Sequence, residues 1–185
     1  MHITNPFANP EKIIGICGGG QLGKMLCEAA SAWDWKTAVL DQSPDDPAAR
    51  LAHKFVQGDF TKYEDVLNFG KQVDVLTIEI EKVNLEALIE LEKMGKIVHP
   101  SPRALGIIKD KALQKQFFID QGLPTVPQEL FDTKADVLKA IESGFLQIPF
   151  VQKLRTDGYD GRGVAIIRTE EDLNLLLDGL CLVEP

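Results

Sequence analysis

The sequence predicts an α/β protein in which a Rossmann-like parallel-sheet domain is followed by a smaller α+β domain. Three observations support this prediction. Short apolar runs alternate with helical stretches through residues 1–99, the first run is followed at once by three glycines, and beyond Pro127 apolar runs come in pairs joined by a tight loop. Alternation of this kind is typical of β-α-β units, whereas strand pairs with tight loops are typical of an antiparallel sheet.

The first domain is expected to begin with a strand, a tight turn and a helix. Residues 12–17 are rich in isoleucine and end at three consecutive glycines, and the following residues 21–32 place apolar side chains at helical spacing. A second strand should end at Asp41, and Asn84 is the expected N-cap of a later helix that stops at Gly95. The second strand covers residues 37–40, and further strands are expected at residues 55–56, 73–78 and 97–98. The helix capped by Asn84 covers residues 85–94, and other helices are expected at residues 48–52 and 63–69.

The second half of the chain changes pattern after a proline-containing break at Pro100 and Pro102. We expect a domain at residues 1–99, a helical connector at 100–127, and the start of an antiparallel lobe at 128–185. The chain stops directly after an apolar run, so we also expect it to be an N-terminal fragment. Beyond residue 99 the expected helices cover residues 104–108, 111–121, 135–142 and 170–177, and the expected strands 129–131, 150–154, 164–167 and 180–183.

Composition excludes several classes of function. The net charge is −8, and lysine and arginine are scattered along the chain, so neither nucleic acid nor an anionic membrane is an expected partner. No run is long enough to cross a membrane, and the first residues do not form a signal peptide. The three cysteines are widely spaced and odd in number, which favours reduced thiols, a cytoplasmic location and no cysteine metal site.

A glycine-rich loop is expected between the strands at 150–154 and 164–167. Gly158, Gly161 and Gly163 interleave with polar side chains, and Lys153 and Arg162 add positive charge on either side. Glycine lets backbone N–H groups approach an anion closely, so this loop is a candidate cover for phosphates. An ordinary glycine-rich hairpin turn is the alternative.

A second glycine motif satisfies the dinucleotide-binding fingerprint. Gly18, Gly20 and Gly23 lie between a predicted strand and helix, and Asp41 follows at the end of the next strand. Taken alone, this pattern favours NAD. A helix N-terminus binds any phosphate, however, so a phosphorylated sugar would serve as well, and glycines needed only for packing are a third interpretation.

Five motifs in order resemble the N5-carboxyaminoimidazole ribonucleotide synthetases, the ATPase subunits of phosphoribosylaminoimidazole carboxylase, within the ATP-grasp superfamily. The resemblance extends from about Lys12 to the last residue. Its motifs are Gly18-Gly-Gly-Gln-Leu-Gly-Lys-Met25, Glu79-Ile-Glu81-x-Val83, Asp110-Lys111 with Gln114-Lys115, Lys153, and Gly158-Tyr-Asp-Gly-Arg-Gly163.

The resemblance implies a carbon–nitrogen ligase of de novo purine biosynthesis. ATP with Mg²⁺ would activate bicarbonate as carboxyphosphate, which carboxylates 5-aminoimidazole ribonucleotide and leaves ADP and phosphate. The Mg²⁺ ligands are expected beyond residue 185, so this chain alone should be inactive, and a homodimer is one expected assembly. Phosphoryl transfer needs charge neutralisation and positioning more than covalent help, which suits lysines, an arginine and backbone amides.

The resemblance also assigns residues to ATP. Lys111 and Lys153 would contact the phosphates, and the loop from Gly158 to Val164 would fold over the nucleotide. Glu184 and Pro185 match the start of the hinge that holds adenine, with a solvated acid as the alternative for Glu184. The catalytic and inward-facing residues of the loop would be Tyr159, Asp160 and Arg162, and the whole loop, with Gly158, Gly161, Gly163 and Val164, would contribute to ATP binding.

Two positions in the sequence qualify these assignments. Many relatives have glycine where this chain has Asp157, and a carboxylate beside a triphosphate is unfavourable unless it points away or pairs with Arg155 or Arg162. Asp41, the acid of the fingerprint, is expected to be a helix cap or turn residue.

For the first domain, likeness to the formate-using glycinamide ribonucleotide transformylase implies a ribonucleotide site at Gly20, Gln21, Leu22 and Glu81. Glu79 would then be structural. Two functions of other classes stay open, an NAD-dependent oxidoreductase and a non-catalytic nucleotide-binding module.

Overall fold

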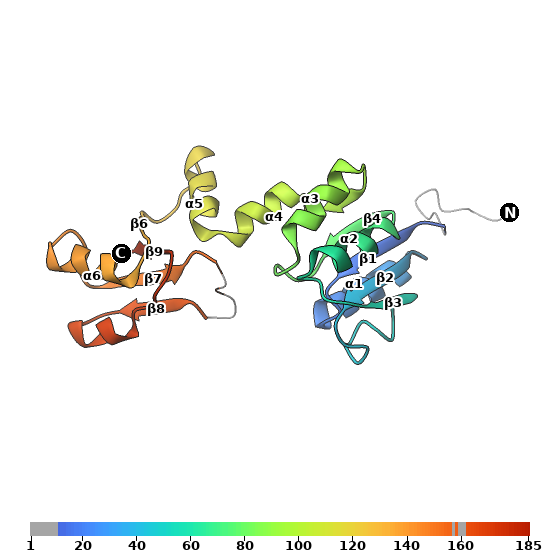
Figure 1. Ribbon diagram of the computed structural model, residues 1–185, viewed down its shortest axis with the longest axis horizontal. Coiled ribbons are helices and arrows are strands. Elements are labelled where there is room, and N and C mark those ends of the chain that lie inside the picture. Colours follow the sequence, from blue (N-terminus) through green and yellow to red (C-terminus); the bar gives the residue numbers. More distant parts are fainter. Residues whose placement is uncertain (1–10, 157, 159–161) are drawn as a thin grey trace. The chain divides into compact units, whose positions relative to one another are not determined.

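The computed structural model describes residues 11–156, 158 and 162–185. The chain forms two compact units, one ending at Leu105 and the other running from Gly106 to Pro185. Figure 1 labels the elements of both. The division falls within α4 (Pro102–Lys109), so residues of the predicted connector belong to both units. That residues 100–127 form a connector distinct from the two domains stays a prediction.

The first unit is built on a five-stranded parallel sheet with the order β3-β2-β1-β4-β5. This confirms the predicted Rossmann-like class. The strands are β1 (Ile13–Cys17), β2 (Lys36–Asp41), β3 (Lys54–Gln57), β4 (Val75–Ile78) and β5 (Ile97–His99), and the helices are α1 (Gln21–Ser31), α2 (Tyr63–Lys71) and α3 (Leu85–Lys93).

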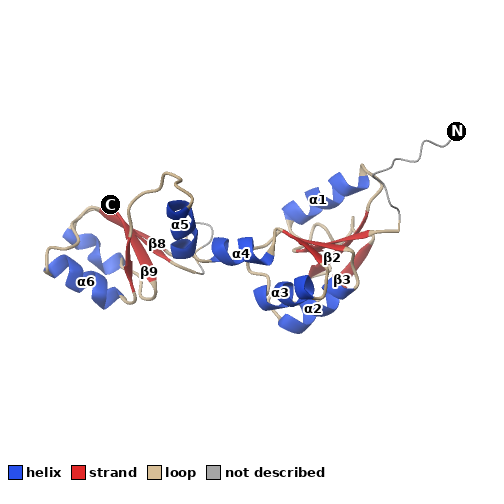
Figure 2. Cartoon of the chain, turned by 90° about the horizontal axis from the view of Figure 1, so that it is seen from above, coloured by secondary structure: helices blue, strands red, loops and turns tan. Residues whose placement is uncertain are grey.

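Helices cover both faces of this sheet, α1 on one and α2 with α3 on the other (Figure 2). Because neighbouring strand residues point to opposite faces, Ile16 packs with Cys27 of α1, whereas Cys17 joins the larger core on the α2–α3 side. Asn84 caps α3 as predicted, accepting a hydrogen bond from the Ala87 N–H at 2.9 Å. Both apolar faces of the sheet are therefore buried, as a parallel sheet requires.

The short helix predicted at residues 48–52 is wrong, because this stretch forms consecutive turns. Ala48 is fully buried, and its N–H donates to the Gly19 carbonyl at 2.9 Å. The carbonyl of Ala48 then accepts from both Leu51 and Ala52 at 3.0 Å. The segment is thus tied to the glycine turn and forms a single helical-type turn that is not continued.

The second unit contains a four-stranded antiparallel sheet with the order β6-β9-β7-β8, which confirms the predicted antiparallel lobe. One face packs on a core that includes Val137, Phe150, Ile167 and Val183. The elements are α5 (Lys111–Asp120), β6 (Glu129–Phe131), α6 (Lys134–Glu142), β7 (Phe150–Leu154), β8 (Val164–Ile167), the 3₁₀ helix η1 (Glu170–Leu175) and β9 (Cys181–Glu184).

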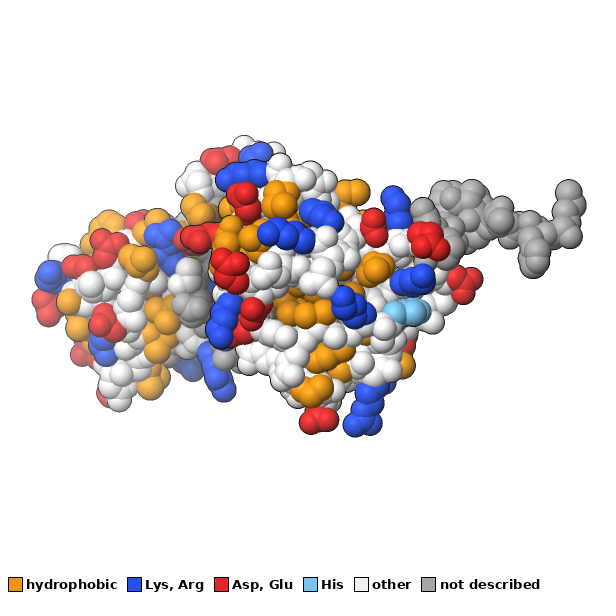
Figure 3. All heavy atoms as spheres, turned by 45° about the vertical axis from the view of Figure 1, so that its right-hand side comes forward, with side chains coloured by type: hydrophobic (Ala, Val, Ile, Leu, Met, Phe, Trp, Pro, Cys, Tyr) orange, Lys and Arg blue, Asp and Glu red, His pale blue; other side chains and the backbone are white. Residues whose placement is uncertain are grey.

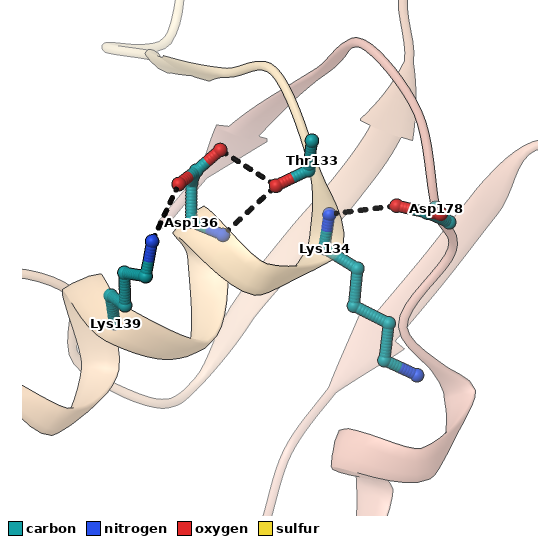
Figure 4. A network of polar contacts seen from close by, with 5 residues as sticks. All are labelled: Thr133, Lys134, Asp136, Lys139 and Asp178. Carbon is teal, nitrogen blue, oxygen red and sulfur yellow. Dashed lines mark hydrogen bonds and ion pairs between the residues drawn. The ribbon is translucent and has the colours of Figure 1, made fainter.

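A polar network fixes the start of α6 (Figure 4). The Thr133 hydroxyl caps the helix by accepting from the Asp136 N–H at 3.2 Å, and it donates to the Asp136 carboxylate at 2.6 Å. Lys139 approaches the other carboxylate oxygen at 3.4 Å. The Lys134 N–H donates to Asp178 at 3.1 Å, which ties α6 to the segment leading into β9.

The helix predicted at residues 170–177 is instead the shorter 3₁₀ helix η1. The buried Gln152 side chain explains the early end, because it bonds both backbone groups of Leu177 at 2.8 Å, accepting from the N–H and donating to the carbonyl. A residue held in this way cannot continue a helical hydrogen-bond pattern.

The surface and the cysteines agree with the composition. On the face drawn in Figure 3, acidic and basic side chains are interspersed with apolar ones. Cys17, Cys27 and Cys181 are free and buried, as expected for reduced thiols. Among the described residues, no helix is long and apolar enough to cross a membrane.

Candidate functional site

The glycine turn after β1 is shaped by contacts that exclude side chains. Gly18 has φ +108°, a conformation that glycine adopts readily, and a Cβ at this position would collide with the carboxylate of Glu79. The Gly18 N–H donates to the Leu40 carbonyl at 3.0 Å, so the turn continues the hydrogen bonds of the sheet. The helix α1 then begins at Gln21 with Gly20 as its N-cap and no side-chain cap. The first N–H groups of α1 are therefore suited to an anion.

Asp41 holds this turn from the neighbouring strand. Its carboxylate accepts the Gly19 N–H at 2.5 Å and the Gln42 N–H at 2.6 Å. The interpretation of Asp41 as a turn residue is confirmed. With each oxygen already bonded to the backbone, this carboxylate is poorly placed to bind a ribose, which counts against the NAD hypothesis.

Glu79 lies beside the same turn. It follows β4 directly, and its N–H donates to the Cys17 carbonyl at 2.8 Å. Burial raises the pKa of the Glu79 carboxyl above its usual value, and the nearby Asp41 carboxylate raises the pKa further. A pocket of about 390 Å³ opens next to it, lined by Leu22, Met25, Leu26, Ile78 and Glu79.

The structure therefore brings Gly20 and Leu22 together with Glu79, whereas Glu81 is an exposed turn residue outside this pocket lining. Gln21 is exposed at the start of α1. The strand β4 ends at Ile78, as predicted, so both acids follow the strand. Strand order indicates that Glu79 lies at the ligand site. The chain runs from β1 outward to β3 on one side and from β4 to β5 on the other, and ligands of such sheets bind at the carboxyl ends of the two strands where this direction reverses.

In the second unit, the ends of the glycine-rich loop are held by the β7–β8 pair. Lys153 is in register with Val164, and the Leu154 N–H donates to the Gly163 carbonyl at 2.8 Å. The Lys111 ammonium donates to the Gly158 carbonyl at 3.2 Å. Arg162 and Val164 are exposed. Asp157, Tyr159, Asp160 and Gly161 lie outside the described residues.

Two lysines converge on Glu184 at the end of β9. Lys153 on β7 contacts the Glu184 Oε2 at 2.5 Å, and Lys115 on α5 forms an ion pair with Oε1. Burial raises the pKa of Glu184, but the hydrogen bonds from Lys115 and Lys153 lower it by more, so the pKa of this carboxyl lies below its usual value. Lys115 belongs to one of the motifs of the resemblance but was not assigned a role there; its spacing one helical turn after Lys111 is the signal that could have identified it.

A third pair fixes the start of α5. Asp110 caps the helix by accepting the Ala112 N–H at 2.9 Å, and Arg155 grips the same carboxylate through Nε at 3.0 Å and Nη2 at 2.6 Å. The Lys111 N–H also donates to the Arg155 carbonyl at 3.0 Å. These bonds join α5 to the end of β7 and hold Lys111 beside the loop.

Pro185 lies at the edge of a hollow at the start of β7. The hollow has a volume of about 400 Å³ and is lined by Pro149, Phe150, Val151, Ile166, Arg168 and Pro185. Its walls are mostly apolar, with one guanidinium. Within the described part of the chain, no group of three or more histidine, cysteine or acidic side chains could hold a metal ion.

Comparison with known proteins identifies similar chains. Residues 11–109 match the model of the ribonucleotide synthetase preATP-grasp domain. The phosphoribosylaminoimidazole carboxylase of Candida glabrata is 40% identical over 174 residues, which are 91% of this chain and 30% of that protein.

Solved structures agree. The N5-carboxyaminoimidazole synthetase of Staphylococcus aureus complexed with ADP has a TM-score of 0.84 and 32% identity, covering 94% of this chain and 47% of that one. The N5-carboxyaminoimidazole synthase of Aspergillus clavatus, in complex with ADP and 5-aminoimidazole ribonucleotide, has a TM-score of 0.80 and 30% identity, covering 94% and 46%. The chain thus spans between about a third and a half of the length of these relatives.

Proposed function

The chain belongs to the ribonucleotide synthetase preATP-grasp family, and from this membership we propose that the whole protein is an ATP-grasp ligase. It would use ATP and bicarbonate to carboxylate 5-aminoimidazole ribonucleotide, the compound bound with ADP in the Aspergillus clavatus relative. The observation that carries the proposal is the convergence of Lys153 and Lys115 on Glu184, beside the loop end held by Lys111.

The charges of this group fit a nucleotide. Three lysines and one carboxylate leave a local excess of positive charge, which suits a polyphosphate. Lys153 and Lys111 would hold the phosphates from two sides and neutralise charge as the terminal phosphoryl group moves to bicarbonate. Tyr159, Asp160 and Arg162 stay proposals as the loop residues that face the second substrate. ATP would arrive with Mg²⁺, whose protein ligands we expect beyond residue 185 and which would supply further charge neutralisation.

The pocket beside the first glycine turn is the proposed ribonucleotide site. The uncapped start of α1, at Gln21 and Leu22, would bind the 5′-phosphate through backbone N–H groups. We assign the carboxylate of this site to Glu79 rather than Glu81, because only Glu79 lines the pocket. It would accept hydrogen bonds from the amine or from ribose hydroxyls.

The test is ADP release by the whole protein, measured with and without bicarbonate and 5-aminoimidazole ribonucleotide. We expect release to need both substrates and Lys153→Met to abolish it. Absence of this dependence in the wild-type protein would refute the proposed reaction. A thermal shift with NADH on the same sample would favour the oxidoreductase, and nucleotide binding without turnover would favour the binding module.

A matched pair of variants tests the carboxylate assignment. Glu79→Gln should raise the KM for 5-aminoimidazole ribonucleotide by roughly tenfold or more, because a hydrogen bond to a charged group is lost, while Glu81→Gln should leave KM unchanged. The reverse result would restore Glu81.

Light scattering on the same preparation checks the proposed homodimer, and the free buried cysteines suit the proposed cytoplasmic location.

A further inference from the structure

Arg155, which directly follows β7, is bonded to the start of α5 and to the start of β9. Its guanidinium grips Asp110 through Nε at 3.0 Å and Nη2 at 2.6 Å, and its carbonyl accepts the Lys111 N–H at 3.0 Å. Its own N–H donates to the Leu180 carbonyl at 3.0 Å. The Arg155 side chain is 25% exposed and the Asp110 side chain 17%. A two-bonded ion pair that is largely shielded from water fixes both a distance and an angle between the segments that it joins.

Asp110 holds the first turn of α5 with the same carboxylate. Its Oδ1 accepts the Ala112 N–H at 2.9 Å as well as the Arg155 Nε. Burial raises the pKa of Asp110, but the hydrogen bonds from Arg155 and from the helix N–H groups lower it by more, so the carboxylate is ionised at neutral pH. The backbone of Lys111, the next residue, is therefore held by a charged pair on one side and by the helix on the other.

From this fixed backbone, the Lys111 side chain reaches the neck of the glycine-rich loop, which we define as Gly158, Arg162 and Gly163. The ammonium donates to the Gly158 carbonyl at 3.2 Å. The neck is narrow, because a Cβ at Gly158 would lie 2.9 Å from the Arg162 carbonyl oxygen and 3.1 Å from the Lys111 Nζ. A Cβ at Gly163 would lie 3.0 Å from the Gly158 Cα. Small shifts of Lys111 relative to the neck would therefore change this contact.

We propose that Asp110 and Arg155 are positioning residues for phosphoryl transfer, and we call their pair the α5 clamp. The inference rests on the proposed function, in which Lys111 holds a phosphate of ATP. A lysine side chain is long and flexible, so the place of its ammonium depends on how firmly its backbone is held. With the α5 clamp closed, Lys111 can exchange the Gly158 carbonyl for a phosphate oxygen while its backbone stays in place. Phosphoryl transfer depends on such positioning more than on covalent help from the protein.

The test measures kcat and KM for ADP release by the whole protein. Asp110→Asn is the most informative variant, because asparagine caps a helix about as well as aspartate but cannot form the charged pair with Arg155. It should lower kcat by about tenfold or more, since a displacement of about 1 Å in a positioning group can cost about a hundredfold. The KM for 5-aminoimidazole ribonucleotide should not change, because the proposed pocket for that substrate lies in the first unit.

A double variant tests whether the two residues act as one unit. Arg155→Met should lower kcat about as much as Asp110→Asn, and the protein carrying both substitutions should lose no more than either single variant. If Arg155→Met does not fold, as judged by circular dichroism, Asp110→Asn decides the question alone.

Thr133→Ala is the matched structural control. It removes the N-cap of α6 in the same unit, where Thr133 bonds to Asp136 and not to the α5 clamp (Figure 4). Loss of a helix cap should lower the midpoint of thermal unfolding. It should leave kcat unchanged, which separates positioning from simple support of the fold.

The inference is overturned if Asp110→Asn keeps the wild-type kcat, or if it raises the KM for 5-aminoimidazole ribonucleotide in place of lowering kcat. Additive losses in the double variant, or an equal loss of kcat in Thr133→Ala, overturn it as well. All of these outcomes leave the proposed function standing, because they are read in an active wild-type background. A wild-type protein whose ADP release does not depend on both substrates overturns the proposed function and, with it, this inference.

Discussion

Replacing Gly23 by alanine should destabilise the first unit, because a Cβ at this position would collide with the carbonyl oxygen of Gly18. Gly23 is buried in α1, and the atom that it would meet belongs to the backbone of the glycine turn. A flexible side chain could move aside, but this carbonyl is held between β1 and the start of α1. The helix would have to shift away from the sheet.

Two opposing effects set the magnitude. Overpacking of a close contact costs about 1–3 kcal/mol. Alanine is a better helix former than glycine by about 0.8–1.0 kcal/mol, which offsets part of this cost. The Cβ would lie less than 3.0 Å from a backbone oxygen, so the upper part of the overpacking range applies and the net loss should be about 1–2 kcal/mol. For a unit of this size that loss lowers the midpoint of thermal unfolding by roughly 5–10 °C.

Gly20→Ala is the matched control from the same motif. A Cβ at Gly20 would meet Glu79 Oε1 at 3.6 Å, an ordinary contact, so this variant should lose only about 0.5–1 kcal/mol, the cost of alanine in place of glycine at an N-cap. The assay is urea and thermal unfolding followed by circular dichroism. Equal destabilisation by both substitutions, or none by Gly23→Ala, would refute the packing explanation of the third glycine.

Three further predictions concern charge and burial. Glu79→Gln should stabilise the first unit at neutral pH, because burial and the nearby Asp41 raise the pKa of Glu79, so the ionised carboxylate destabilises the fold. The wild-type protein regains this stability as the carboxyl is protonated, as pH falls toward 4.5. Melting curves of variant and wild type should therefore converge in acid, and a constant difference would contradict this explanation. Glu184→Gln should lower the free energy of unfolding by about 3 kcal/mol at neutral pH, because it breaks a largely buried ion pair. The lysines lower the pKa of Glu184, so the stability advantage of the wild-type protein should disappear as pH falls below 4.5. A stability difference that persists in acid unfolding curves would be inconsistent with the ion pairs. The three thiols of the native chain should resist alkylation by iodoacetamide, because all three are buried. Burial, and then the charge of Asp41, raise the pKa of Cys17 to about 12. Mass spectrometry should find three alkylated cysteines only after unfolding, and rapid labelling of the native chain would show that the thiols are accessible.

The order of elements could be predicted from local patterns. Apolar runs and helical spacing predicted both sheets, and the glycine positions marked the two turns that matter. Errors arose where a distant contact decided local structure. Ala48 is tied to Gly19, and Leu177 to Gln152, and neither pairing leaves a trace in the surrounding sequence.

For the candidate site, the sequence by itself determined the chemistry: which glycines open the turns, that lysines flank the second loop, and that acids follow β4. Only the tertiary structure decided which of these groups meet. Glu79 lies beside the first turn because β4 pairs with β1, and Lys115 reaches Glu184 because α5 packs beside β9. Motif spacing fixes residue types along the chain, whereas strand order and helix packing fix distances between residues far apart in sequence, and those distances determine burial, charge pairing and binding.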